Sequence, residues 1–181
     1  MSRAWLILAS DRVSRGERAD QTEGRVRAVL EAAGLELAGV QAVPDEQPAL
    51  EQALRQACLR AELVLTSGGT GIAPRDVTPE ATRAVIEREI PGLGEAMRAA
   101  SGGAVPTAPL SRALAGTRGR TLIVNLPGSP GGAEECLRAI LPALRHALKL
   151  LAMVHFYGRP EIERQLGYVS PLLRVPRAEA T

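Results

Sequence analysis

The chain has 181 residues and a formal net charge of +2; 45% of its residues are hydrophobic and 23% are charged. This length fits one domain, and the charge is too small to indicate nucleic acid or an anionic membrane as a partner. With one Trp, one Phe and two Tyr, the chain lacks the aromatic side chains on which proteins that bind single strands stack bases.

The two cysteines, Cys58 and Cys136, fall in helix-like segments without the spacing of metal ligands, so we expect both to be small buried groups. No signal-peptide pattern opens the chain, and no apolar run approaches the roughly 20 residues of a membrane-spanning helix. We therefore expect a cytoplasmic protein with reduced thiols and no membrane contact.

Apolar runs alternate with helical patterns in the first half of the chain. The predicted elements are a strand over 4–9, a helix over 24–33, a strand over 37–43, a helix over 48–60 and a strand over 63–66. Gly34 follows the first helix directly, as a glycine that caps a helix end does.

In the second half, a helix is predicted with Thr78 as its N-cap and Pro79 in its first turn, and 90–92 should end it. A shorter helix over 94–100 and a strand over 121–125 follow. The last predicted helix covers 133–153, and Pro142 should kink it.

This alternation predicts an α/β fold, a three-layer α/β/α sandwich with a mostly parallel sheet. Ligands of such sheets bind beyond the carboxyl ends of the strands. The polar loops at Ser10-Asp11, Asp45, 68–76 and 125–129 all follow predicted strands, so we expect them to converge on one edge. We assign 1–154 to a single domain and 155–181 to an irregular extension.

The loop Ser67-Gly68-Gly69-Thr70-Gly71 is the strongest candidate for a ligand site, because its three glycines leave main-chain amides uncovered. It is neither a P-loop nor a dinucleotide fingerprint, since it lacks the lysine of the first and the third glycine of the second. Arg75 could pair with a phosphate, and Asp76 could hold magnesium or cap the next helix. The glycines could equally serve backbone geometry.

The run 67–82 closely resembles the signature of the MoaB/Mog family, the stand-alone molybdopterin adenylyltransferases and their counterparts in gephyrin and plant fusion proteins. Further segments match in the same order, so that the resemblance extends over roughly residues 4 to 152; they are 10–16, 43–46, 90–93, 111–116, 125–130 and 133–150. One departure lies at Glu23, where the family more often has glycine.

The resemblance implies transfer of an adenylyl group from ATP to molybdopterin with release of pyrophosphate. It also implies that Asp45 and Asp76 are catalytic and organise Mg²⁺ with the triphosphate. The residues it assigns to substrate binding are Ser10 and Asp11 beside the nucleotide, Ser67, Gly68, Gly69, Thr70, Gly71 and Arg75 at the phosphates, Ser101 at substrate phosphate, and Asn125, Pro127, Gly128 and Ser129 in a second wall.

Each aspartate has a structural alternative, because Asp45 could cap the helix that begins near Pro48 and Asp76 the helix at Thr78. The resemblance further implies a homotrimer and hand-over of the product to a molybdate-insertion enzyme. A protein that only binds or delivers molybdopterin is the first alternative. Molybdate insertion is a weaker one, because related insertion enzymes are much longer chains, and a generic nucleotide-binding protein is the weakest.

Overall fold

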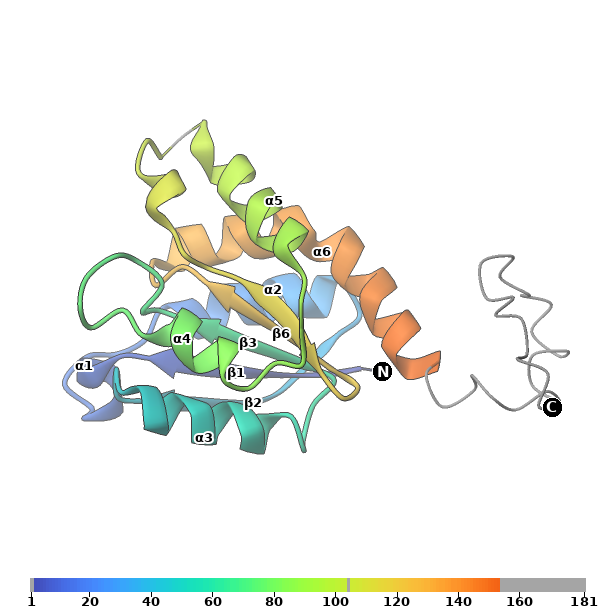
Figure 1. Ribbon diagram of the computed structural model, residues 1–181, viewed down its shortest axis with the longest axis horizontal. Coiled ribbons are helices and arrows are strands. Elements are labelled where there is room, and N and C mark those ends of the chain that lie inside the picture. Colours follow the sequence, from blue (N-terminus) through green and yellow to red (C-terminus); the bar gives the residue numbers. More distant parts are fainter. Residues whose placement is uncertain (1, 104, 154–181) are drawn as a thin grey trace, which may run out of the picture.

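The computed structural model describes residues 2–103 and 105–153. They form one sheet with helices packed against it (Figure 1). The elements in chain order are β1 (Arg3–Ala9), α1 (Asp11–Ser14), α2 (Thr22–Ala32), β2 (Glu36–Val43), α3 (Gln47–Ala57), β3 (Leu63–Ser67), α4 (Thr78–Arg83), β4 (Arg88–Glu89), α5 (Pro91–Gly102), the 3-10 helix η1 (Ala108–Leu110), β5 (Ala115–Arg118), β6 (Thr121–Leu126) and α6 (Pro130–Met153). The predicted extension over 155–181 lies outside the described residues.

The six strands are arranged in the order β2-β1-β3-β6-β5-β4. The four strands from β2 to β6 are parallel, whereas β5 runs antiparallel to β6 and β4 antiparallel to β5. The mostly parallel sheet is therefore confirmed, and the two antiparallel strands at its edge are additions that the sequence did not predict.

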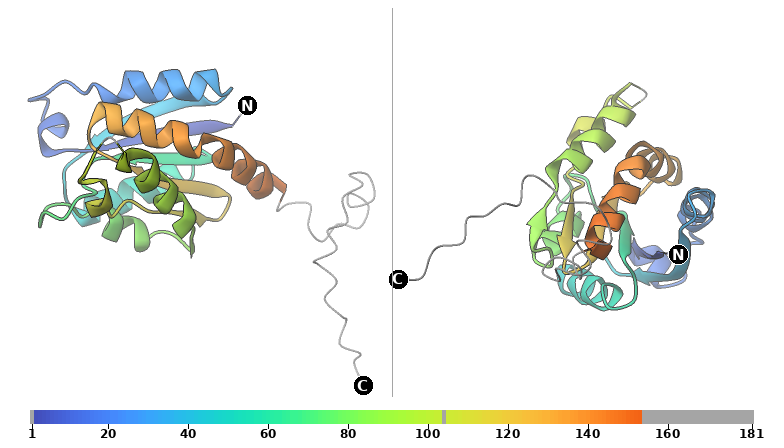
Figure 2. Two further views of the ribbon diagram at one scale, coloured as in Figure 1. Left: turned by 90° about the horizontal axis from the view of Figure 1, so that it is seen from above. Right: turned by 90° about the vertical axis from the view of Figure 1, so that its right-hand side faces the viewer.

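Helices cover both faces of the sheet, which confirms the three-layer sandwich (Figure 2). Leu6 and Leu8 of β1 pack with α2, α5 and α6 on one face. Ile7, between them, packs with α3 and α4 on the other face. Burial on both sides explains why the central strands are nearly continuous apolar runs, since all five residues of β3 are buried.

The segment between α4 and α5 differs from the prediction. The helix expected to continue to residue 90 ends at Arg83, and Thr78 is its first residue, with Val77 in the cap position. Arg88 and Glu89 instead form β4 against β5. A side chain at Gly116 of β5 would place its Cβ 2.6 Å from the Arg88 carbonyl oxygen, so glycine permits this close pairing.

Pro91 begins α5, where we expected a helix to end, because its fixed φ suits the first position of a helix. Helix α5 is consequently longer than predicted. Helix α6 extends through Pro142 to Met153 and begins three residues earlier than predicted, at Pro130. None of the helices in the described part of the chain combines the length and the apolar character of a membrane span.

The carboxyl ends of the four parallel strands meet at one edge of the sheet. Ala9 pairs with Val43, and Ser67 pairs with Leu126. The residues that follow these strand ends are therefore neighbours, as predicted from the alternation of strands and helices.

Candidate functional site

Two glycines of the loop after β3 are required by backbone geometry. Gly68 and Gly69 have φ values of +106° and +61°. A Cβ at Gly68 would lie 2.3 Å from the carbonyl oxygen of Ala9, and one at Gly69 would lie 2.5 Å from the hydroxyl oxygen of Thr78. The geometric explanation of the glycines, left open by the sequence, therefore holds for both.

The same loop also offers main-chain donors. The amide of Gly68 donates to the carbonyl oxygen of Leu126 at 3.3 Å. Within the described part of the chain, the amides of Gly69, Thr70 and Gly71 donate to no main-chain or side-chain group. The free amides thus run over 69–71, and Gly68 shapes the loop without contributing a free donor.

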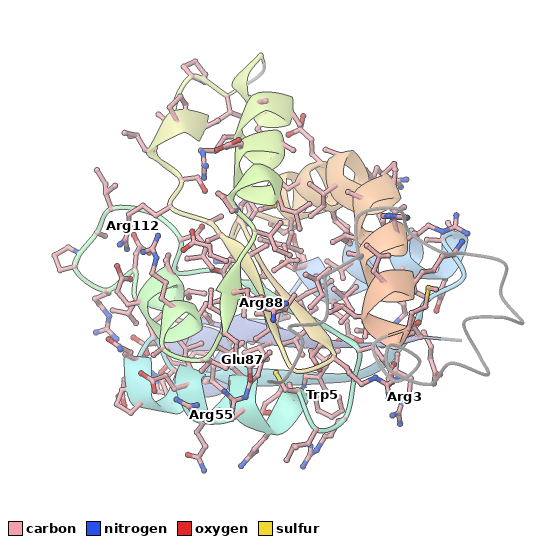
Figure 3. All side chains as sticks on the ribbon, turned by 45° about the vertical axis from the view of Figure 1, so that its right-hand side comes forward. Arg3, Trp5, Arg55, Glu87, Arg88 and Arg112 are labelled. Carbon is pink, nitrogen blue, oxygen red and sulfur yellow. The ribbon has the colours of Figure 1, made fainter. Side chains whose placement is uncertain are left out.

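Arg112 holds the carbonyl side of this loop (Figure 3). Its main-chain amide donates to the Thr70 carbonyl oxygen at 2.8 Å, and its Nε donates to the Gly71 carbonyl oxygen at 2.6 Å. The guanidinium also contacts the carbonyl oxygen of Asp76 and the carboxylate of Glu80. Sequence reasoning did not assign Arg112 a role, because no local pattern signals a contact across 41 residues.

Asp11 and Asp45 join the ends of β1 and β2 by a reciprocal pair of hydrogen bonds. The Asp11 amide donates to Asp45 Oδ2, and the Asp45 amide donates to Asp11 Oδ1, each at 3.1 Å. Arg75 forms an ion pair with Asp11. Burial raises the pKa of Asp45, with the negative charges of Asp11 and Asp76 adding to this, while the Asp11 amide and Arg75 oppose it.

The Asp76 side chain forms a hydrogen bond within the segment between β3 and α4. Its Oδ2 accepts a hydrogen bond from the Ala73 amide at 2.8 Å. The cap positions of the two neighbouring helices are occupied by Glu46 and Val77, so the helix-cap alternatives for Asp45 and Asp76 are wrong. In the part of the molecule that is described, the Oδ1 atoms of both aspartates accept no hydrogen bond.

Asp11, Asp45, Arg75 and Asp76 form an acidic rim, and the carboxylate oxygens of Asp45 and Asp76 fit a magnesium ion that is shared with a ligand. Mg²⁺ prefers hard oxygen donors and is usually held by one or two carboxylates together with substrate phosphates. Asp45 and Asp76 each have an oxygen available for this. No group of three or more His, Cys, Asp or Glu side chains over 2–103 and 105–153 could by itself hold a metal ion.

We expect Asp45→Asn to stabilise the protein at neutral pH. Burial raises the pKa of the Asp45 carboxyl in the folded state above its value in the unfolded state. The contribution of this carboxyl to folding stability is therefore fully present below the unfolded pKa, and it is lost as the pH rises through the raised folded pKa. At neutral pH the ionised carboxylate thus lowers the stability of the fold. The variant removes this cost and should raise Tm at pH 7 by about 1–3 °C.

The gain should shrink as the pH falls through the raised pKa of the folded carboxyl, and it should be absent below about 4, where the carboxyl is neutral in both the folded and the unfolded state. Thermal melts of both proteins between about pH 3 and pH 8 measure it. Glu31→Gln, an exposed change on α2, is the control that should show no such trend. A Tm difference that stayed constant across this range would contradict the pH argument.

A cavity of about 530 Å³ lies between the glycine loop, α5, η1 and the start of α6. Five predicted site residues line it: Thr70, Gly71, Ser101, Pro127 and Ser129. Its opening carries three apolar side chains, since Ile72 is 68% exposed, Leu110 52% and Val105 42%. Such a hollow suits a ligand with a flat apolar body and a few polar groups.

A smaller hollow of about 100 Å³ lies on the other side of the loop. Four more predicted residues line it: Ser10, Ser67, Gly68 and Gly128. A Cβ at Gly128 would lie 3.1 Å from the Gly68 Cα, so the loops after β3 and β6 touch here. The loop after β3 therefore lies between two hollows, and the acidic rim combines residues that follow β1 and β2 with Arg75 and Asp76 from the segment after β3.

Asn125 lies in neither hollow. Its side chain is fully buried, and its Nδ2 donates to the hydroxyl oxygens of Thr66 at 3.0 Å and Thr82 at 2.8 Å. It thus ties β6 to β3 and α4. The structure does not bring this residue to the second wall that we expected it to form.

Ser101 lines the large cavity, as expected, but its partner is a carboxylate. Its Oγ donates to Glu135 Oε2 at 2.9 Å and lies 3.6 Å from Cys136 Sγ. Glu135 was not predicted as a site residue, because in the sequence it is one of several polar positions on a long amphipathic helix. Both cysteines are free thiols; Cys136 is buried, as expected, whereas Cys58 is only partly buried.

Known proteins of one family are similar in sequence to most of this chain. Residues 5–146 match the family described as "Probable molybdopterin binding domain". A molybdopterin adenylyltransferase of Helicobacter pylori (strain J99) is 42% identical over 150 residues, covering 81% of this chain and 85% of the relative. One from Haemophilus influenzae is 42% identical over 176 residues, covering 87% and 88%.

A solved structure agrees with these sequence relatives. The crystal structure of the molybdopterin biosynthesis enzyme MoaB from Thermus thermophilus has a TM-score of 0.79 and 52% identity. The match covers 83% of this chain and 96% of that chain. The layered fold and the segments that build the site therefore have close counterparts among proteins of molybdopterin biosynthesis.

Proposed function

Since the chain belongs to the family of probable molybdopterin-binding domains, we propose that it is a molybdopterin adenylyltransferase of molybdenum cofactor biosynthesis. It would use ATP and Mg²⁺ to convert molybdopterin into adenylyl-molybdopterin and pyrophosphate. The observation that supports this best is the divided site, in which a loop with free amides separates a large, mostly apolar cavity from an acidic rim.

The nucleophile of this reaction is the terminal phosphate of molybdopterin, which is already anionic at neutral pH. One of its oxygens forms a bond to the α-phosphorus of ATP, and the bond to the bridging oxygen of pyrophosphate breaks. No side chain needs to remove a proton. Of the two histidines, His146 lies within the residues that the structure describes; it is exposed on α6 and has no part in this scheme.

The protein's contribution is to align two polyanions and to hold the charge that develops between them. The free amides of 69–71 donate to phosphate oxygens where the two hollows meet. Asp45 and Asp76 would hold Mg²⁺ through their free oxygens, and the bound ion neutralises charge on the triphosphate. Arg75, paired with Asp11, would contact the same phosphates.

The decisive test is incubation of the purified protein with ATP, Mg²⁺ and molybdopterin. Release of pyrophosphate together with a product whose mass equals adenylyl-molybdopterin is the expected result. A folded protein that binds molybdopterin but releases no pyrophosphate would instead be the binding or delivery protein. The presence of both carboxylates at the rim favours the enzyme.

Two further parts of the proposal come from the family resemblance: a homotrimer and hand-over of the product to a molybdate-insertion enzyme. A third, a cytoplasmic location, comes from the sequence pattern. The oligomeric state is the most direct to measure, by sedimentation equilibrium, and a mass of three chains is expected. Two free cysteines are in keeping with a reducing compartment.

A further inference from the structure

Glu135 is a carboxylate in a largely apolar cavity. It lies in the second turn of α6, is half-buried and lines the cavity of about 530 Å³. Its Oε2 accepts the hydrogen bond of Ser101 Oγ. Within the described ranges, its Oε1 accepts no hydrogen bond and the carboxylate forms no ion pair. An unused, half-buried acceptor in a concave site is suited to bind a ligand.

The described residues around Glu135 fix the direction of this acceptor but leave its charge unpaired. Ser101, which is 8% exposed, holds one oxygen in place. Among the described lining residues, Arg98 is the one cation, and its Nη1 donates to the carbonyl oxygens of Ser111 at 3.3 Å and Ala113 at 3.0 Å. Arg98 is therefore engaged with the main chain.

The charge of Glu135 also orients a ligand along the cavity. Carboxylate and phosphate repel each other, so a phosphate group should avoid the Ser101–Glu135 pair. The groups in the cavity that could receive an anion are the free amides of Thr70 and Gly71 and the first turn of α6 at Gly131 and Gly132. A phosphorylated ring compound therefore places its phosphate there and its ring against α5 and η1.

We propose that Glu135 binds the aminopyrimidinone edge of the pterin ring of molybdopterin, with Ser101 as the residue that positions it; this rests on the proposed function. That edge presents two neighbouring donors, the ring N3–H and the 2-amino group. A carboxylate is an acceptor with two oxygens at matching spacing, and such paired, charge-assisted hydrogen bonds are both strong and geometrically selective.

The same carboxylate keeps the other substrate out of this cavity. The corresponding edge of adenine presents one donor, the 6-amino group, and one acceptor, N1. The lone pair of N1 would face a carboxylate oxygen, which is repulsive. Glu135 would thus assign the large cavity to the pterin and leave ATP to the side of Ser10 and Gly68.

The test uses two fluorescent probes, 6-hydroxymethylpterin phosphate and the lumazine phosphate in which a carbonyl replaces the 2-amino group. Wild-type protein should bind the pterin at least about 10-fold more tightly. Glu135→Gln should weaken pterin binding about 10- to 100-fold and bind the lumazine better than wild type does, because the amide can donate to the new carbonyl. The KM for ATP should not change.

Two variants complete the experiment. Glu134→Gln is the matched control, since this neighbour on α6 pairs with Arg25 and Arg138 and does not line the cavity; it should leave both affinities unchanged. Ser101→Ala should lower the preference for the pterin by a smaller factor than Glu135→Gln. Melting curves verify that each variant is folded.

The assignment as an enzyme and the recognition of the pterin by Glu135 can be disproved separately. If wild-type protein releases no pyrophosphate but its preference for the pterin depends on Glu135, the recognition holds and the enzymatic assignment fails. If the protein is active and Glu135→Gln keeps the wild-type preference, the recognition by Glu135 is overturned. Wild-type protein that binds neither probe, or both equally, overturns it as well.

Discussion

Asp76→Asn is expected to lower the kcat for pyrophosphate release about 10²- to 10³-fold while the protein stays folded. The carbonyl oxygen of asparagine can still accept the hydrogen bond that Asp76 Oδ2 receives from the Ala73 amide at 2.8 Å, so the loop should stay closed. Asparagine lacks the negative charge needed beside the triphosphate. The loss should therefore fall on kcat, with Tm nearly unchanged.

Initial rates at several Mg²⁺ concentrations make this test specific. If Asp76 helps to hold the ion, the variant should need more Mg²⁺ to reach half of its own maximal rate. Glu31→Gln again serves as the control, because it removes an exposed carboxylate far in sequence from the loop. Wild-type kcat for Asp76→Asn at ordinary Mg²⁺ would exclude Asp76 from catalysis.

The layered architecture could be predicted because its central strands are buried on both faces. β3 is five buried residues in a row, and such a run between helical patterns is typical of a parallel sheet. β4 and β5 could not be predicted in this way, because they are two and four residues long and contain exposed or small residues. Their pairing depends on a close contact at Gly116, which only the folded chain shows.

The outline of the site follows from chain order, since polar loops after parallel strands must share one edge. The exceptions have physical reasons. Asn125 sits on the same face of β6 as Ile123, so the strand's alternation directs it toward α4 and into the core. Arg112 and Glu135 are placed by contacts between distant segments, and neither has a local signature in the sequence.

Gly68→Ala should destabilise the fold more than the same change at Gly69 or Gly71 of the loop. The residue has a φ of +106°, and an added Cβ would lie 2.3 Å from the main-chain oxygen of Ala9. A main-chain atom in the buried β1 strand cannot move aside as a flexible side chain could. We expect a cost of about 2–4 kcal/mol, which corresponds to a fall in Tm of about 5–15 °C.

Gly24→Ala is the matched control for this change. Gly24 lies inside α2 with nothing within 4 Å of an added Cβ, so alanine should raise Tm slightly through its higher helix propensity. Opposite signs for the two substitutions would show that the Gly68 effect arises from the loop and not from loss of glycine in general. An unchanged Tm for Gly68→Ala would contradict the close approach of the loop to β1.

Gly71→Ala separates the shape of the loop from its chemistry. An added Cβ there would meet the carboxylate of Asp76, with Oδ2 nearest at 2.7 Å, and this is the end of a side chain that can move. Its stability cost should therefore be smaller than that of Gly68→Ala, whereas the displaced carboxylate should lower kcat by at least about 10-fold. Melting curves and pyrophosphate release on both variants measure this. If Gly68 supports the fold and Gly71 supports the position of Asp76, the two substitutions will rank in opposite order in stability and in activity.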